Sequence, residues 1–309
     1  MEITFLGTGT SQGVPVISCN CDICKSKDSK DQRLRSSIFI QTENNAILID
    51  AGPDFRQQML REHISNLDAI LITHGHKDHL GGLDDVRAFN YSQKRAMDIY
   101  AQENVNNEII KGYSYAFEEQ KYPGVPEMNL RTIHNSPFII NKDTITPIEV
   151  MHHHLPVLGY RIKDFTYITD ANYIKETEIQ KIEGSKIIVL NALRKKKHLS
   201  HFNLDEAVAL LIKLKPEQAY LTHISHLMGF HKEIEKFSSG TYDFIDLSEE
   251  IIAIAKESQI KNGLINIQSL HTSAAVLCNE NEPLLLEDFR RNLEATAEKA
   301  GKYQHDNLA

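Results

Sequence analysis

Long apolar segments are missing from this sequence. No run in the 309 residues approaches the roughly 20 apolar residues that a membrane-spanning helix needs. The first residues, 1–6, carry no basic region of the kind that opens a signal peptide, and they start directly on a strand-like pattern. These features argue against a membrane protein, and we expect a soluble, cytoplasmic protein.

Basic residues are in the minority. The chain has 34 lysines and arginines against 42 aspartates and glutamates, which gives a formal net charge of −8. Affinity for a phosphate backbone comes largely from basic surface, so no stable binding of nucleic acid is expected. A small phosphorylated substrate held by metal ions is not excluded by this charge.

Cysteine is also scarce, but it is not scattered. Of the four cysteines, Cys19, Cys21 and Cys24 lie within six residues. In a cytoplasmic protein such crowding suggests a metal site rather than disulfides. Three thiols at this spacing can surround one tetrahedral ion and leave one ligand to come from elsewhere. The alternative is a loop with incidental thiols.

What the sequence does contain is a cluster of histidines after a buried strand. The apolar run 67–72 predicts a strand, and the seven residues after it include His74, His76, Asp78 and His79. A loop at the end of a strand can direct several short side chains to one point. Imidazole and carboxylate are ligands for zinc, manganese or iron, so this H-x-H-x-D-H spacing predicts a site for one or two metal ions.

The same arrangement recurs along the chain. Apolar strands are expected at 46–50, 146–150, 165–169 and 218–222, and each is followed closely by a residue of metal-ligand type. Helices are expected at 54–63, 83–88 and 204–214, whereas 90–130 gives no clear pattern. Polar residues at the ends of packed strands are a common way to build a site. The residues concerned are Asp50, the histidine loop, His153, Asp170 and His223.

Two further segments leave their roles open. Residues 7–15 turn on three glycines, but their spacing is not that of a phosphate-binding P-loop, so an ordinary tight turn is favoured. The basic run 194–197 either attracts an anionic substrate or is a solvated charged surface.

Taken together, these motifs resemble the metallo-β-lactamase-fold hydrolases. Within them, the sequence is most similar to the branch that contains phosphoribosyl 1,2-cyclic phosphate phosphodiesterase. The branch is marked by Leu-Gly-Thr-Gly at 6–9, Gln-Gly-Val-Pro at 12–15, the cysteine cluster, and Leu-Thr-His-Ile-Ser-His at 221–226. The resemblance implies an α/β fold, an αββα sandwich over residues 1–236, with a small α+β appendage after it.

The resemblance also implies a set of ligands for two divalent ions, zinc or manganese. The first ion would be bound by His74, His76 and His153, the second by Asp78, His79 and His223, and both by Asp170. Among the three consecutive histidines, His153 is chosen because the ligand of the family lies six residues before the Gly-Tyr pair at 159–160; His152 and His154 are the alternatives.

Further roles follow from the same resemblance. His201 matches a histidine near the substrate phosphate, and together with Asp78 it is expected to be catalytic. Asp50 matches a carboxylate that orients the metal loop. Two ions about 3.5–4 Å apart can share a hydroxide at neutral pH and attract a phosphodiester. Cys19, Cys21, Cys24 and His226 would bind a separate structural zinc.

The C-terminal residues depart from that family. After a junction at 237–240, residues 241–309 resemble the first half of the secondary thiamine-phosphate synthase family, through Thr-Tyr-Asp-Phe at 241–244 and His-Thr-Ser-Ala-Ala at 271–275. Half a fold gives no independent active site, so His271 and His305 receive no catalytic role. We expect this segment to be a packing or oligomerisation appendage, or the remnant of a fusion.

The sequence therefore predicts a dinuclear metal-dependent phosphodiesterase that acts on a small cyclic or nucleotide-like phosphodiester. One alternative is an RNA-processing nuclease of the same fold, although neither a protruding arm nor a basic surface is evident. A second is a non-catalytic metal-binding module. A homo-oligomer is compatible with each of them.

Overall fold

Two short apolar runs form the buried centre of the first sheet. Strands β3 (Ala46–Ile49) and β4 (Ala69–Leu71) pair in parallel, and all of their residues are buried. Such strands are apolar throughout because both faces of the sheet are covered. The expected hairpin is present, since β2 (Ser37–Gln41) pairs antiparallel with β3. In the computed structural model, the residues that can be described are 1–234, 288 and 291–292.

The first sheet has the strand order β1-β2-β3-β4-β5-β6. Its other strands are β1 (Glu2–Gly7), β5 (Met97–Ala101) and β6 (Met128–Thr132). Four α-helices accompany it: α1 (Phe55–Arg61), α2 (Lys77–Leu80), α3 (Arg87–Gln93) and α4 (Glu103–Gly112). Buried side chains of these helices, among them Phe55 and Ile109, form one hydrophobic cluster with Leu48 and Ile70 of the sheet.

The second sheet has the order β11-β8-β9-β10-β12-β13, with β7 paired to β8. Its strands are β7 (Phe138–Ile140), β8 (Asp143–His152), β9 (Leu155–Ile162), β10 (Phe165–Ile168), β11 (Tyr173–Ile174), β12 (Ile187–Asn191) and β13 (Gln218–Thr222). The helices α5 (Glu176–Ile182) and α6 (Leu204–Leu214) pack on it through Ile179, Ile182 and Leu211. The helix α7 (His231–Ile234) follows β13.

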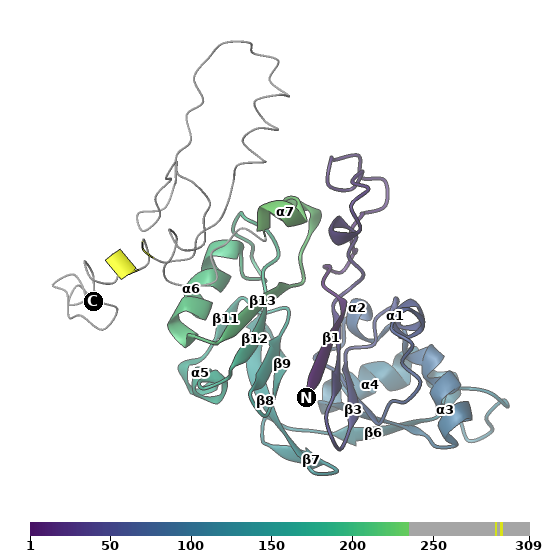
Figure 1. Ribbon diagram of the computed structural model, residues 1–309. Helices are drawn as coiled ribbons and strands as arrows, with labels where there is room; N and C mark the ends of the chain where they lie inside the picture. The colour runs from purple at the N-terminus through teal and green to yellow at the C-terminus, as the bar shows by residue number, and fades with distance from the viewer. Residues whose placement is uncertain (235–287, 289–290, 293–309) are drawn as a thin grey trace. The chain divides into compact units, whose positions relative to one another are not determined.

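A third hydrophobic cluster lies between the two sheets. It brings Ile38 and Ile47 of the first sheet together with Tyr160 and Phe165 of the second. Helices therefore cover the outer faces of two sheets that pack on each other (Figure 1). This four-layer arrangement confirms the predicted αββα sandwich and the α/β class.

Parallel pairing brings the ends of several strands to the same edge of each sheet. In the second sheet β12 runs parallel to both β10 and β13, and in the first β3, β4 and β5 are parallel. Two contacts tie the sheets together near these ends. The Tyr160 hydroxyl donates to the carbonyl of Ile72 at 2.7 Å, and the amide of Leu158 donates to the carbonyl of Thr73 at 3.1 Å. Polar residues that follow strands of either sheet can thus reach a common site.

The helices and strands of the described residues agree with those expected from the sequence, except in two regions. The helix expected at 83–88 is a 3₁₀ turn at Leu83–Val86 followed by α3, and the uninformative stretch 90–130 contains β5 and α4. The elements expected within 241–299, and the histidines at 271 and 305, lie outside the described residues. Within the described part of the chain, every helix is too short or too polar to traverse a lipid bilayer.

Candidate metal centre

The histidine loop is held in place by Asp50, which follows β3. One carboxylate oxygen of Asp50 accepts from the amide of Thr73 at 2.8 Å, and the other accepts from the Thr73 hydroxyl at 2.9 Å. Because that hydroxyl donates its proton to Asp50, it accepts from Nδ1 of His74, 3.0 Å away. The Nε2 of His74 therefore carries a lone pair, and this lone pair faces His76.

His74 and His76 present their ring nitrogens to each other. The Nε2 of His74 lies 2.9 Å from Nδ1 of His76. Two nitrogens bound to one tetrahedral zinc at about 2.05 Å lie roughly 3.3 Å apart, so the observed spacing suits two ligands of the same ion. Burial lowers the pKa of His74 well below its ordinary value. The ring is thus held in the neutral form that metal binding requires.

A second group of ligands surrounds His79, at the end of the same loop. Its Nδ1 donates to Asp50 at 2.7 Å, which leaves a lone pair on Nε2. That Nε2 is buried and makes no hydrogen bond, although it lies 3.1 Å from an oxygen of Asp78 and 3.2 Å from an oxygen of Asp170. Nitrogen and carboxylate lone pairs that converge in a buried place require a cation between them. The residues therefore fit a divalent metal ion.

Asp170 belongs to two clusters of ligand-type atoms, one with Asp78, His79 and His223 and one with His152 and His201. Its Oδ2 lies 3.2 Å from His79 and 3.1 Å from Nδ1 of His223, and its Oδ1 lies 3.1 Å from Nε2 of His201. Burial would raise the pKa of Asp170, but His223 and His79 outweigh it and hold that pKa well below its usual range. Asp170 is thus a carboxylate at the point where these two clusters meet.

The electrostatic environment shifts the pKa values of His79 and His223 in opposite directions. Burial disfavours the charged ring of His79, but Asp170 and Asp50 outweigh this effect and raise its pKa well above the ordinary value. For His223 burial prevails and lowers the pKa to about 4. The carboxylates therefore create a strong demand for positive charge at His79, which either a proton or a metal ion can meet.

Three of these residues end a strand in the same unusual conformation. Asp50, Asp170 and His223 have φ angles of 65°, 54° and 56°, in the left-handed region. This region costs non-glycine residues roughly 1–2 kcal/mol each, and such strain concentrates at functional sites. The turn it produces directs a side chain from the strand end across the edge of the sheet.

The choice among the three consecutive histidines was wrong. β8 ends at His152, which pairs with Leu155, so His153 and His154 form the two-residue turn of the hairpin. His153 has a φ of 57°, is exposed, and packs on His154 with ring centroids 3.6 Å apart. It therefore points away from the cluster.

His152 occupies the expected place instead. Its ring centroid lies 5.8 Å from that of His74 and 5.3 Å from that of His76. The Nδ1 of His152 donates to the carbonyl of Ser200 at 2.8 Å, which leaves Nε2 as the available ligand atom. The alternation of strand side chains was the missed signal, because Ile148, Val150 and His152 lie on one face of β8.

His201 lies beside the cluster on a loop that α6 anchors. At the start of α6, the side chain of Asn203 accepts from the amide of Glu206 at 2.8 Å, and Glu206 accepts from the amide of Asn203 at 3.1 Å. This capping box fixes the loop that carries His201. His201 donates from Nε2 to Asp170, and its Nδ1 lies 3.0 Å from the Ser200 hydroxyl. The basic run 194–197 has an internal hydrogen bond, in which Arg194 donates to the carbonyl of Lys197 at 2.8 Å.

The glycine-containing loop 7–15 packs between the sheets. A Cβ on Gly9 would lie 2.7 Å from the carbonyl oxygen of Arg33, so only glycine allows this approach. Gly9 pairs with Ile224, and the hydroxyl of Thr10 lies 3.2 Å from Nε2 of His223. The loop thus supports His223, and Thr10 is a contact of the cluster that the sequence did not reveal.

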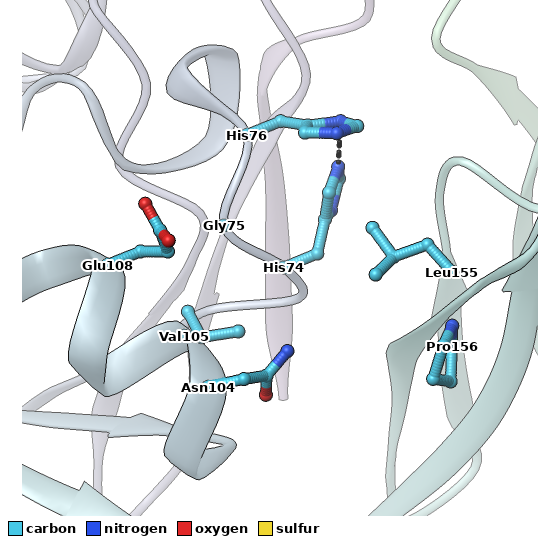
Figure 2. Close-up of a pocket in the computed structure, with 8 residues that line it drawn as sticks. All are labelled: His74, Gly75, His76, Asn104, Val105, Glu108, Leu155 and Pro156. Atoms are coloured by element: carbon cyan, nitrogen blue, oxygen red, sulfur yellow. Dashed lines mark hydrogen bonds between the residues drawn. The ribbon is translucent and has the colours of Figure 1, made fainter.

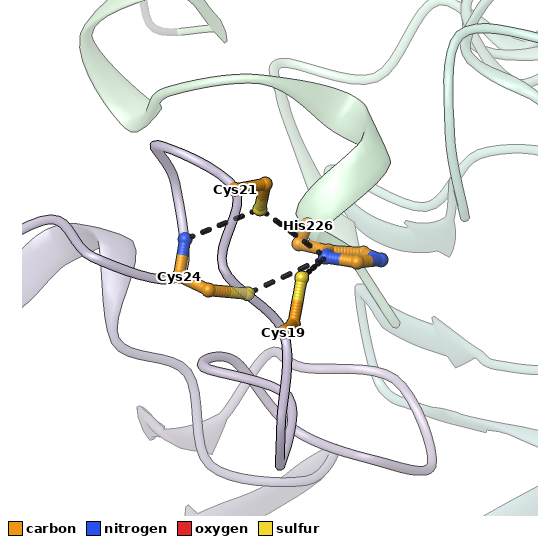
Figure 3. Close-up of side chains that lie close together, drawn as sticks. All are labelled: Cys19, Cys21, Cys24 and His226. Atoms are coloured by element: carbon orange, nitrogen blue, oxygen red, sulfur yellow. Dashed lines mark hydrogen bonds between the residues drawn. The ribbon is translucent and has the colours of Figure 1, made fainter.

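The cysteine cluster is a separate site (Figure 3). The Sγ atoms of Cys19, Cys21 and Cys24 lie 3.3, 3.5 and 3.3 Å from Nδ1 of His226. A tetrahedral zinc with Zn–S near 2.3 Å and Zn–N near 2.05 Å places sulfur and nitrogen roughly 3.5 Å apart, which matches. The amide of Cys24 donates to Sγ of Cys21 and lowers the Cys21 pKa to about 6. This favours the thiolate that binds metal.

Comparisons with known proteins agree with this geometry. Residues 45–224 match the model of the beta-lactamase superfamily domain, and residues 232–308 match that of the UPF0047 protein YjbQ-like family. The second match covers the residues that resemble secondary thiamine-phosphate synthase.

Several individual proteins are similar over the same region. An octanoyltransferase of Porphyromonas gingivalis is 39% identical over 236 residues, which are 75% of this chain and 48% of that protein. A ribonuclease Z of a Nostoc species is 29% identical over 187 residues, 58% of this chain and 52% of that protein. The chain thus spans about half the length of these curated relatives.

Solved structures support the fold. A diphosphatase from the PhnP family is 36% identical, with a TM-score of 0.71 over 76% of this chain and 91% of that one. Zinc-bound PqqB from Methylobacterium extorquens shares the fold at 18% identity, with a TM-score of 0.63 over 76% of this chain and 94% of that one. Since the superfamily match covers more than half of the sequence, the chain belongs to the beta-lactamase superfamily, among the hydrolases with the metallo-β-lactamase fold.

Proposed function

We propose that residues 1–236 form a dinuclear metal-dependent phosphodiesterase for a small cyclic or nucleotide-like phosphodiester. The observation that carries the proposal is the convergence of side chains from both sheets on Asp170. His74, His76 and His152 would hold one ion, Asp78, His79 and His223 the other, and Asp170 both. Histidine and carboxylate suit zinc and manganese equally.

The chain supplies the groups that such a reaction needs. When bound, the two ions supply a nucleophile derived from water at neutral pH and positive charge for the phosphate oxygens. Asp50 orients His79 and, through Thr73, His74. Hydrolysis forms a bond from phosphorus to the oxygen of water and breaks one to the leaving alkoxide. His201, whose Nε2 lies 3.1 Å from an oxygen of Asp170, would act with both ring nitrogens protonated, give one proton to that alkoxide and return to the neutral ring.

Metal removal tests the proposal on the full-length protein. The protein loaded with zinc or manganese is expected to hydrolyse bis(p-nitrophenyl) phosphate and a cyclic nucleotide. A chelator should lower this activity at least about twenty-fold, and added metal should restore it. No turnover of any phosphodiester at about three ions per chain, two for the candidate metal centre and one for the cysteine cluster, would contradict the proposal.

The similarity to ribonuclease Z supports a second candidate, an RNA-processing nuclease. The net charge of −8 opposes it, because binding to tRNA depends on basic surface. A tRNA precursor in the same assay separates the two functions. Cleavage of the precursor with no turnover of small diesters would favour the nuclease, and no turnover of either would favour a non-catalytic metal-binding module.

We also propose that the cysteine cluster holds a structural zinc. The site joins the loop 16–25 to the segment that carries both His223 and His226. Residues 241–309 would be an appendage for packing or oligomerisation. The candidate metal centre would bind a small phosphodiester rather than nucleic acid.

Cys21→Ser is expected to reduce the metal content from about three ions per chain to about two and to lower the free energy of unfolding by about 3 kcal/mol. The reason is the loss of one thiolate from a four-ligand site. Elemental analysis and denaturant unfolding provide the measurements. Cys278→Ser makes the same chemical change in the remaining cysteine and should leave the zinc content unchanged. Equal zinc content in both variants would disprove the structural zinc.

A further inference from the structure

The loop between β12 and α6 carries a second histidine, His198, three residues before His201. Backbone hydrogen bonds fix this loop at its base: the amide of Leu193 donates to the carbonyl of Phe202 at 3.0 Å, and the amide of Phe202 donates to the carbonyl of Ala171 at 2.7 Å. Within the loop, the ring centroids of His198 and His201 lie 5.0 Å apart. The two imidazoles are therefore held next to each other on one anchored segment.

The Nδ1 atom of His198 carries a lone pair. The backbone amide of Ser200 donates to it at 3.3 Å, and a backbone amide can only donate. Burial lowers the pKa of His198, and the neighbouring His201 and Arg194 lower it further, which favours the neutral ring. The hydrogen of that neutral ring is therefore on Nε2.

The lone pair of His198 faces Nδ1 of His201, 3.2 Å away. Two lone pairs at this distance would repel each other, so Nδ1 of His201 carries a hydrogen and donates it. The hydroxyl of Ser200 lies 3.0 Å from this Nδ1 and 3.4 Å from that of His198, so it can accept from the first and donate to the second. Both neighbours are thus satisfied by an N–H group at Nδ1 of His201.

The opposite nitrogen of His201 faces the candidate metal centre. Its Nε2 lies 3.1 Å from Oδ1 of Asp170, and the ring stacks on His223 with centroids 4.9 Å apart. Such contacts restrict the place of the ring, but not a half turn about the bond that carries it, which would put a carbon where each nitrogen was. The hydrogen bond from Nδ1 to His198 excludes this second orientation.

We propose that His198 is a positioning residue for phosphodiester hydrolysis: it holds the N–H at Nδ1 of His201 and thereby directs Nε2 to the leaving alkoxide. The inference rests on the proposed function and deepens it. As the bond from phosphorus to the leaving oxygen breaks, the hydrogen on Nε2 moves to that oxygen. The hydrogen on Nδ1 stays in its bond to His198, and the ring becomes neutral. A catalytic histidine is commonly oriented in this way by a group at its second nitrogen.

Two diesters that differ only in the leaving group test the proposal. They are methyl phenyl phosphate and methyl p-nitrophenyl phosphate, assayed with the metal-loaded full-length protein. p-Nitrophenolate is the weaker base of the two leaving groups and depends less on protonation. His198→Ala should therefore lower kcat for the phenyl ester roughly ten-fold, and kcat for the p-nitrophenyl ester less than about two-fold. The KM values and the metal content should stay those of wild type.

A conservative variant and a matched control accompany this substitution. In His198→Asn, the amide oxygen takes about the place of Nδ1 and accepts the same hydrogen bonds, so most of the rate with the phenyl ester should return. His134→Ala removes an imidazole from an exposed position between β6 and β7. It should leave both rates within about two-fold of wild type.

Several results would overturn the proposal. One is no loss, or an equal loss, with the two esters in His198→Ala; others are a loss of metal from that protein and an asparagine variant as slow as the alanine variant. In each case, turnover of the esters by wild type leaves the phosphodiesterase function standing. If wild type with full metal content hydrolyses neither ester, the proposed function itself fails.

Discussion

Asp170→Asn is expected to lower the rate of phosphodiester hydrolysis at least 10³-fold, which corresponds to roughly 4 kcal/mol of transition-state stabilisation. The substitution keeps the shape of the side chain and removes its charge. Asp170 contacts His79, His201 and His223, and among the described residues it is the carboxylate that belongs to both clusters of ligand-type atoms. The measurement is kcat/KM for bis(p-nitrophenyl) phosphate, together with the number of ions bound per chain.

Asparagine is chosen because the backbone at this position has a φ of 54°. Asparagine tolerates the left-handed region better than most residues, so the strand end should keep its conformation. Asp164→Asn is the control, since this exposed aspartate precedes β10 just as Asp170 follows it. Its activity should equal that of wild type. A fully metal-loaded Asp170→Asn protein with activity within ten-fold of wild type would contradict the proposed centre.

Much of the candidate site could be predicted because its ligands follow buried strands. The alternation of apolar strand and polar end is visible in the sequence at Asp50, His74 and His223. The fold then brings these ends together, since the strands they follow lie in two sheets that pack on each other. Ligand spacing within the histidine loop is local and could be read directly. Which ligand binds which ion is inferred from the resemblance to the metallo-β-lactamase-fold hydrolases, and the number of ions bound by the Asp170→Asn protein tests this inference.

Other parts of the site depend on contacts that leave no local pattern. Thr10 and His223 meet although they are 213 residues apart. The helix α4 carries Asn104 and Glu108, which line a cavity together with His74 and His76 (Figure 2). Neither residue belongs to a motif, and the chain around them gave no clear periodicity. The placement of residues of this kind is set by tertiary packing, which the sequence alone does not show.

The pair His152 and His153 provides the second test, because the two residues are adjacent and identical. His152→Ala is expected to lower kcat/KM roughly 10³-fold and to reduce the metal content, whereas His153→Ala should remain within about two-fold of wild type. The reason is the hairpin: His152 ends β8 and its Nδ1 donates to Ser200, while His153 lies in the exposed turn. Each variant is the control for the other.

Comparing the two variants distinguishes the loss of a metal ligand from a loss of folding. Both substitutions remove the same imidazole from the same hairpin, so any general effect on β8 and β9 should appear in both unfolding curves. His153→Ala loses only the packing on His154 and is expected to cost less than about 1 kcal/mol. If His153→Ala instead lost metal and activity while His152→Ala kept both, the hairpin would have to be shifted by one residue. Such a shift would move every side chain of β8 to the opposite face and remove Ile148 and Val150, which are fully buried, from the cluster that they form with α5 and α6.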